Sequence, residues 1–282
     1  MALRYAYNTN GCNNHRLYDA LDLIAEVGYD GVALTLDWHH LDPFAKDWKE
    51  QAERLKRRLD ELKLGSVIET GARFLLDPKV KHEPTLIHKY QKGRERRVQF
   101  LKRAIDIAKI LESETVSFWA GVLGEDVSKE EGLHYLKEGI RQVAQYASEQ
   151  GVVVSLEPEP GMLIETITEY QTIANELENP LKLALDIGHV WVTGEMEPGE
   201  AIRQYAADAG TISIEGMNKG VHIHLPLHEG NMDVPEIIHQ LQKIAYPKLV
   251  CVELSREGHR AHLAIKESIQ YVKEVERKMM EA

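Results

Sequence analysis

The feature that most constrains the fold is a unit that recurs along the chain. A segment of helical periodicity closes at a glycine, and a short β-branched run follows at once, as in residues 25–37, 60–72 and 147–159. A glycine just past a helix supplies a left-handed cap, and apolar runs of five to eight residues are typical of buried strands. This alternation of helices and strands predicts a parallel sheet.

Eight strands are predicted in this way, at residues 3–8, 31–37, 66–72, 115–121, 152–158, 182–187, 211–215 and 248–254. Eight such units allow closure into a (β/α)8 barrel, and 282 residues suit one barrel domain. An open doubly wound sheet is the competing architecture, but no glycine-rich phosphate-binding motif follows any strand. We therefore predict an α/β protein with a single (β/α)8 TIM barrel domain over residues 1–282.

Composition excludes several classes of protein. A formal net charge of −11 disfavours tight binding to nucleic acid or to anionic membranes. No apolar run approaches the length of a membrane span, and the first residues lack the apolar core of a signal peptide. The two cysteines lie far apart, so a disulfide framework is not expected. A cytoplasmic location follows as the default.

Chemically useful side chains gather at one end of the predicted strands. In such barrels the catalytic groups lie at the carboxyl ends of the strands. Seven of the eight strands deliver an acid, a histidine or an aromatic there: Asp37, His39, His40, Glu69, Trp119, Glu157, Glu159, Asp186, His189, Glu215, His222, His224, Glu253 and His259. Residues 73–93 form a connection too long for an ordinary loop, and such loops are usually functional.

The two-residue alternation of strands indicates where three of these acids point. Bulky apolar residues flank the position two residues before each acid and suit a helix-facing side, which would aim Glu157, Asp186 and Glu253 at the barrel axis. The positions two residues before the acids hold Ser155, Ala184 and Cys251. Three inward carboxylates repel one another unless a cation neutralises them. The pattern therefore predicts a divalent metal.

Two histidine patterns strengthen this prediction. His189 follows Asp186 by three residues, and His222 alternates with His224, and both spacings fit metal ligation. Each also has a plainer interpretation, because a strand-end aspartate often caps a helix and a single histidine is often a packed or surface residue. Residues 222–226 equally fit a short edge strand. Trp119 is either core packing or a wall of the substrate pocket.

The stretches EPEPG, DxxH and VELSR, in this order, resemble the xylose-isomerase-like barrels. That superfamily includes sugar-phosphate isomerases and epimerases and the endonuclease IV type of AP endonuclease. The resemblance implies metal ligation by Glu157, Asp186, His189 and Glu253. The stretch HIHLPLHEGN resembles a segment of the endonuclease branch and places His222 and His224 at metal positions of that branch. Members are often dimers or tetramers, so a homo-oligomer is also implied.

The chain departs from the superfamily pattern in two places. Ser213 stands where a histidine ligand is expected, so either His222 or His224 compensates, Glu215 does, or the metal site is weakened or lost. The endonuclease branch also has histidines at the ends of strands 3 and 4, where this chain has Glu69 and Trp119. Its trinuclear metal cluster therefore does not carry over directly.

Together these residues lead to one leading hypothesis and two alternatives. The leading one is a metal-dependent isomerase or epimerase of a small sugar or sugar phosphate, working through an enediolate, with Glu157 and Glu253 as base and acid. Substrate contacts are assigned to Glu69, Arg73, Trp119 and Arg256; the arginines would hold a phosphate or carboxylate, or form rim salt bridges. Mn²⁺ or Zn²⁺ is expected, with Mg²⁺ or Co²⁺ as further choices. The alternatives are an endonuclease IV-like metal-dependent phosphodiesterase and a non-catalytic metabolite-binding barrel.

Overall fold

The computed structural model describes residues 3–281, and within them parallel strands close into a ring. The order around the ring is β1-β10-β7-β6-β5-β4-β3-β2. The strands are β1 (Arg4–Asn8), β2 (Gly31–Thr35), β3 (Gly65–Glu69), β4 (Val116–Trp119), β5 (Val154–Glu157), β6 (Lys182–Asp186), β7 (Ala209–Ile214) and β10 (Leu249–Val252). The predicted α/β barrel is confirmed, and each predicted strand overlaps an observed one.

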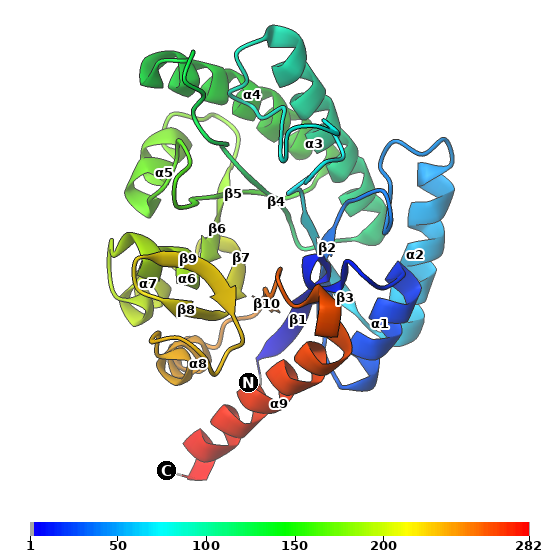
Figure 1. Cartoon of the computed structure of the whole chain (residues 1–282), viewed down its shortest axis with the longest axis vertical. Helices are drawn as coiled ribbons and strands as arrows, with labels where there is room; N and C mark the ends of the chain where they lie inside the picture. Colours follow the sequence, from blue (N-terminus) through cyan, green and yellow to red (C-terminus); the bar gives the residue numbers. More distant parts are fainter. Residues whose placement is uncertain (1–2, 282) are drawn as a thin grey trace.

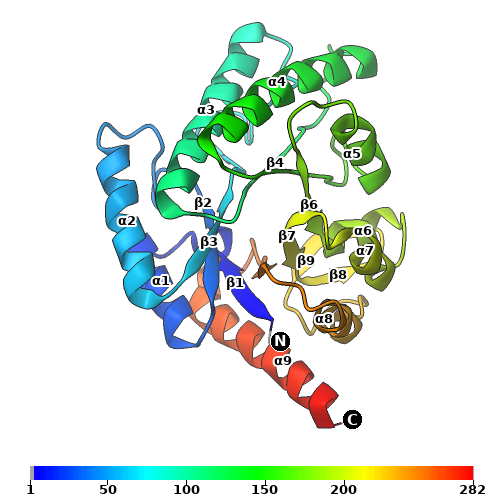
Figure 2. The ribbon, with the colours of Figure 1, turned by 180° about the vertical axis from the view of Figure 1, so that it is seen from behind.

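Helices surround this ring, as Figure 1 shows from one side and Figure 2 from behind. They are α1 (Leu17–Glu26), α2 (Trp48–Leu62), α3 (Gln91–Leu111), α4 (Lys129–Gln150), α5 (Ile167–Ala174), α6 (Ile187–Thr193), α7 (Pro198–Tyr205), α8 (Val234–Lys243) and α9 (Ala261–Glu281). None of the helices in the described chain is long and apolar enough to cross a bilayer.

Helix ends show where the recurring glycine acts as expected and where it does not. α4 begins at a capping box, in which the Ser128 hydroxyl accepts from the Glu131 backbone N–H and the Glu131 carboxylate accepts in return. It ends at Gly151 in the left-handed conformation, as predicted. For α2 the prediction is wrong, because Lys63 takes the left-handed conformation (φ 57°) and Gly65 begins β3. A Cβ at Gly65 would lie 3.1 Å from the Arg4 side chain, so glycine leaves room there.

Side chains of the ring divide between an inner and an outer core. The inner cluster is small and consists of Ala6, Ala33, Val67, Leu249 and Cys251. The neighbours of Cys251 on β10, which are Val250 and Val252, belong instead to the large outer core against the helices. Burial of each such side chain contributes about 1.5–3 kcal/mol. The alternation predicted for this strand is confirmed, and it aims Glu253, two residues past Cys251, inward.

A two-stranded antiparallel hairpin stands outside the ring. It consists of β8 (Gly216–Asn218) and β9 (Val221–Leu225) and lies against α6 (Figure 1). β9 confirms the interpretation of residues 222–226 as a short strand, whereas β8 was not predicted. The hairpin brings its histidines to the same end of the barrel as the strand-end acids.

The first and last strands of the ring pair with each other. β1 pairs with β2 on one side and with β10 on the other. α9 packs alongside, and the Tyr5 hydroxyl donates to the Glu276 carboxylate at 3.1 Å. Figures 1 and 2 both show α9 beside β1. Closure of the barrel therefore joins segments that are about as far apart in sequence as the chain allows.

Candidate metal and substrate site

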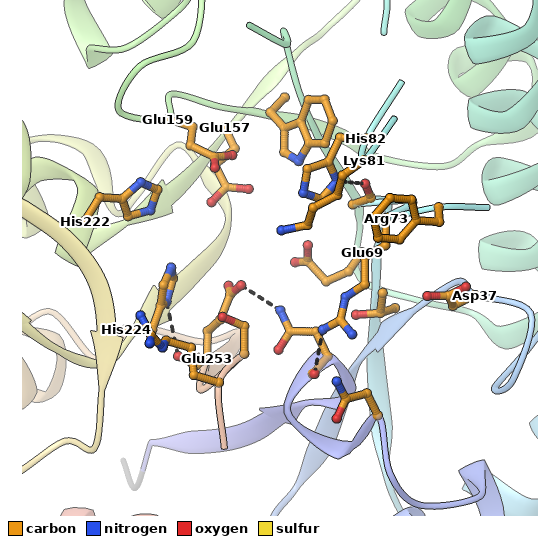
Figure 3. Close-up of a pocket in the computed structure, with 18 of the residues that line it drawn as sticks. Asp37, Glu69, Arg73, Lys81, His82, Glu157, Glu159, His222, His224 and Glu253 are labelled. Atoms are coloured by element: carbon orange, nitrogen blue, oxygen red, sulfur yellow. Dashed lines mark hydrogen bonds between the residues drawn. The ribbon is translucent and has the colours of Figure 1, made fainter. Parts of the chain in front are cut away.

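A pocket of about 800 Å³ lies at the carboxyl ends of the strands (Figure 3). Nine of the predicted site residues line it: Glu69, Arg73, Trp119, Glu157, His189, His222, His224, Glu253 and Arg256. Asp186 does not line it and is buried beside His189 (3% exposed). The volume suits a small-molecule ligand.

Glu157, Asp186 and His189 form the first group able to hold a metal. One ligand atom from each lies within 4.8 Å of the others. His189 Nδ1 is 3.5 Å from Glu157 Oε1, and His189 Nε2 is 3.8 Å from Asp186 Oδ2. Asp186 Oδ2 and His189 Nε2 are buried and have no hydrogen-bond partner among residues 3–281. Two buried polar atoms without partners that face each other at this distance fit a cation between them.

His189 is also oriented for ligation. Its Nδ1 lies 3.1 Å from the carbonyl oxygen of Pro158, which is at the end of β5. If Nδ1 donates to that carbonyl, the lone pair of Nε2 is free, the usual arrangement of a ligating histidine. The backbone N–H of His189 donates to Asp186 Oδ1 at 2.9 Å, because Asp186 caps α6. Oδ1 of Asp186 therefore serves as the helix cap, and Oδ2 is left available as a metal ligand.

A second group shares His189. His189, His222 and His224 offer nitrogens within 4.8 Å of one another, and the His222 ring centroid lies 4.7 Å from that of His189. The two-residue spacing on β9 puts His222 and His224 on one face. We call Glu157, Asp186, His189, His222 and His224 the ligand wall.

Glu253, the remaining predicted ligand, belongs to neither group. Its carboxylate accepts a hydrogen bond from Asn10 Nδ2 at 2.8 Å, and its carbonyl oxygen lies 3.3 Å from His224 Nδ1. In Figure 3 it reaches into the pocket from the side opposite Glu157. Its position fits a group that meets the substrate.

Burial sets the charge of the ligand wall. Burial, followed by the negative charges of Glu69 and Glu253, raises the pKa of Glu157 well above its usual value. Burial lowers the pKa of His189 to about 4, so its imidazole is neutral at pH 7. For Asp186 burial alone would raise the pKa, but the adjacent imidazoles of His189 and His224 and the cap hydrogen bond lower it. The wall thus offers the neutral imidazole of His189 and the carboxylate of Asp186, a suitable pair of ligands for a divalent cation.

Ser213 stands where the superfamily has a histidine ligand, and Glu215 is one of its expected replacements. The structure shows where both lie. Ser213 is buried on β7, in register with Asp186. Glu215 is fully buried, its oxygens have no hydrogen-bond partner within residues 3–281, and a Cβ at Gly188 would overlap its carboxylate. Burial and then the charge of Asp186 raise the pKa of Glu215 well above its usual value. Of the expected replacements, His222 and His224 lie within ligand distance of His189, whereas Glu215 belongs to neither group.

The opposite side of the pocket is built from β3, β4 and the segment that follows β3. Burial, then the charge of Glu253, raises the pKa of Glu69 to about 8. Trp119 is 7% exposed: the Arg97 guanidinium lies 4.5 Å from its ring centroid, and the His82 ring meets it edge-on at 5.3 Å. Arg97 is itself buried and donates to the Thr70 carbonyl oxygen at 2.7 Å. Trp119 is therefore both core packing and pocket wall.

Five pocket residues come from the long connection between β3 and α3, namely Gly71, Arg73, Phe74, Lys81 and His82, which we call the loop wall. Arg73 was predicted to meet the substrate, but Lys81 and His82 were missed, as was Asn10 after β1. For Lys81 and His82 the only signal in the sequence is the length of the connection. No periodicity relates a loop residue to a pocket.

Comparison with known proteins identifies the fold independently. A family model described as xylose isomerase-like TIM barrel matches residues 21–275. Among curated protein sequences, none matches the chain.

Several solved structures have the same fold. A crystal structure of an IolI protein with a bound zinc atom has a TM-score of 0.77 at 19% identity, covering 97% of this chain and 98% of its own. A D-tagatose 3-epimerase-like protein has a TM-score of 0.74 at 20% identity, covering 96% and 99%. The 3-keto-D-glucoside 4-epimerase YcjR from E. coli has a TM-score of 0.76 at 15% identity, covering 96% and 99%. At these identities the likeness shows the fold.

Proposed function

The chain belongs to the xylose isomerase-like TIM barrel family, and from its site we propose that it is a metal-dependent isomerase or epimerase of a small sugar or sugar phosphate. The observation that carries the proposal is the ligand wall, whose facing Asp186 Oδ2 and His189 Nε2 are buried without partners. Structural neighbours described as sugar epimerases, and one described as holding zinc, support it.

The ligand wall is the proposed metal site. Glu157, Asp186 and His189 would hold one ion, and His222 and His224 would complete or extend this set through the shared His189. A divalent ion, when bound, would polarise the substrate oxygens and stabilise negative charge on them. The carboxylates favour Mn²⁺ or Mg²⁺ and the three imidazoles favour Zn²⁺ or Co²⁺.

Glu157 and Glu253 are the proposed acid–base pair. They enter the pocket from opposite sides, so a sugar bound between them would present one face to each (Figure 3). One carboxylate takes the proton from a carbon next to the carbonyl, which leaves an enediolate. The other returns a proton, to the same carbon for an epimerase or, after transfer between the oxygens, to its neighbour for an isomerase. Each group contributes about 10²–10⁴-fold to the rate.

The remaining polar groups would orient the substrate. Asn10 holds the Glu253 carboxylate, which fixes the direction from which that group approaches. Glu69, with its raised pKa, is protonated at neutral pH and would donate a hydrogen bond to a substrate oxygen. Trp119 would offer apolar surface to the sugar.

The first experiment measures the metal content of the purified protein by elemental analysis, for the wild type and for Glu157→Gln. We expect bound manganese or zinc in the wild type and its loss in the variant. A wild type that holds no metal even after incubation with divalent ions would contradict the proposal and favour the non-catalytic metabolite-binding barrel.

The second experiment follows exchange of substrate C–H for deuterium in D2O by NMR, over a panel of ketoses and sugar phosphates. Glu157→Gln and Glu253→Gln should each abolish exchange while the thermal transition stays unchanged or rises, since repulsion between carboxylates is relieved. Unfolding of either variant with exchange intact would make these acids structural.

One observation favours a second candidate, a phosphodiesterase like endonuclease IV. The group His189, His222 and His224 could hold a further ion beside the first. Against this stand the net charge of −11 and the positions Glu69 and Trp119, where that branch has histidines. Two or more metal ions per chain together with cleavage of an abasic oligonucleotide would decide for this candidate; one ion without cleavage would decide against it.

A further inference from the structure

Three cations line the pocket without a carboxylate partner: Arg73, Lys81 and Arg256. Within residues 3–281 none of them forms an ion pair. Some basic side chains on the surface do find acids: Arg58 contacts Asp22 and Glu61, and Arg277 contacts two glutamates of α9. The observation that calls for an explanation is that these three charges converge on one pocket, in a chain with 45 acidic and 34 basic residues.

Two of these cations share the loop wall and are placed for a common ligand. The Arg73 guanidinium donates from Nη2 to the Asn10 carbonyl oxygen at 2.8 Å, which leaves its other N–H groups free. Lys81 follows eight residues later and extends its ammonium group into the pocket (Figure 3). Both lie across the pocket from His222 and His224. Arg256 is exposed on another segment, after β10.

The charges of Arg73 and Lys81 act on the ionisable groups around them. Burial, with smaller contributions from the charges of Lys81, Arg97 and Arg73, lowers the pKa of His82 to about 4. Burial also lowers the pKa of His40 to about 4, with a further contribution from Arg73. These histidines are neutral at pH 7 and add no charge. Burial, then the charge of Glu253, raises the pKa of the Glu69 carboxyl group to about 8. Asp37 and Glu159 also line the pocket, but within residues 3–281 neither forms an ion pair with Arg73 or Lys81.

We propose that Arg73 and Lys81 bind an anionic group of the substrate, a carboxylate or a phosphate, across the pocket from the ligand wall. The substrate is then a sugar acid or a sugar phosphate rather than a neutral sugar. An arginine fork and a lysine ammonium form charge-assisted hydrogen bonds with either anion. A pocket of about 800 Å³ has room for a monosaccharide with such a group. The sugar part of this inference rests on the proposed function, whereas the anion site does not.

The test compares three probes that differ in charge: D-fructose, D-fructose 6-phosphate and D-glucuronate. Binding to the metal-loaded protein is measured by calorimetry and by the shift of the thermal transition. We expect at least one anionic probe to bind about 10-fold or more tightly than fructose, and the anion preferred distinguishes phosphate from carboxylate. If neither anion binds more tightly than fructose, the proposal is wrong.

Variants assign the preference to the two side chains. Arg73→Met and Lys81→Met should each weaken binding of the anion about 10-fold to 100-fold and leave fructose unaffected, given the strength of hydrogen bonds to charged groups. Arg73→Lys keeps the charge and should retain most of the preference. Arg96→Met and Lys79→Met are matched controls, because both residues are exposed nearby and neither lines the pocket. Equal anion binding by the wild type and the double variant Arg73→Met/Lys81→Met would overturn the proposal.

Deuterium exchange separates this proposal from the proposed function. Anion binding that depends on Arg73 and Lys81, without C–H exchange in any probe, would leave the anion site standing and refute the isomerase. Exchange in an anionic probe that is equally fast in the wild type and in the double variant would leave the isomerase standing and refute the anion site. A thermal transition within a few degrees of the wild type excludes unfolding as the cause.

Discussion

The ligand wall and the loop wall face each other across one pocket but are built in different ways. Residues of the ligand wall lie at the ends of buried strands, in α6 or in the hairpin, and Glu157, Asp186 and His189 are at most 9% exposed. Charged side chains of the loop wall come from a segment without helix or strand, and Lys81 is exposed. The first wall is held by its scaffold, whereas the second can adapt to a ligand. Chemistry that needs fixed geometry belongs to the first and recognition to the second.

The largest expected effect is the loss of metal when the ligand wall alone is changed. Asp186→Asn removes a ligand oxygen but keeps an oxygen that caps α6, so the fold should persist. We expect bound metal to fall to near zero by elemental analysis. His82→Ala, the control in the loop wall, should leave metal content unchanged. Equal loss in both variants would erase the distinction between the walls.

The second largest expected effect is on stability, when an alanine replaces a glycine beside each wall. A Cβ at Gly188 would overlap the Glu215 carboxylate, while a Cβ at Gly71 in the loop wall would meet nothing within 4 Å. Gly188→Ala should therefore lower the free energy of unfolding by about 1–3 kcal/mol, the usual cost of overpacking. Gly71→Ala should change it by less than about 0.5 kcal/mol. Denaturant titration measures both, and a tolerated alanine at position 188 would mean that Glu215 moves freely.

The pH dependence of the metal-free protein tests the carboxyl group between the walls. The pKa of Glu69 is raised to about 8, so between pH 4.5 and 8 the folded state holds a proton that the unfolded state releases. Stability should therefore fall as pH rises through this window, by at most about 1.4 kcal/mol per pH unit for one proton. Glu69→Gln should flatten the slope in denaturant titrations at pH 5.5, 7 and 8.5. An unchanged slope would assign the effect to other acids.

The smallest expected effect concerns the pocket mouth. Trp38 lines the pocket but is 73% exposed, so Trp38→Ala should change the free energy of unfolding by less than about 0.5 kcal/mol. Thermal unfolding measures this directly. A loss above 1 kcal/mol would show that the mouth is packed against something in solution, such as a second copy of the chain.

The same contrast explains what the sequence could predict. Strand-end acids were found because the spacing of Cys251 and Glu253 follows a two-residue period that the pleat imposes. The pairing of His222 with His224 followed from the same rule. Lys81 and His82 obey no period, since the path of a loop depends on contacts that are distant in sequence.

Two further features lay beyond the sequence for local physical reasons. Glu253 faces inward as predicted, but its hydrogen bond to Asn10 holds it apart from both ligand groups, and no pattern relates these residues. Glu215 lies two residues after Ser213, so the period of a strand would point both side chains inward. Its carboxylate instead fits the space left by Gly188. A side chain's final direction depends on which neighbour leaves room.

The pairing of β1 with β10 has a consequence for synthesis on the ribosome. β1 is made first, but one of its edges has no partner until residues 249–252 have been translated and have left the exit tunnel. Throughout that time the nascent chain exposes an open strand edge, the kind of surface that pairs with other chains. Nearly the whole polypeptide must therefore be kept from aggregating before the last strand closes the ring.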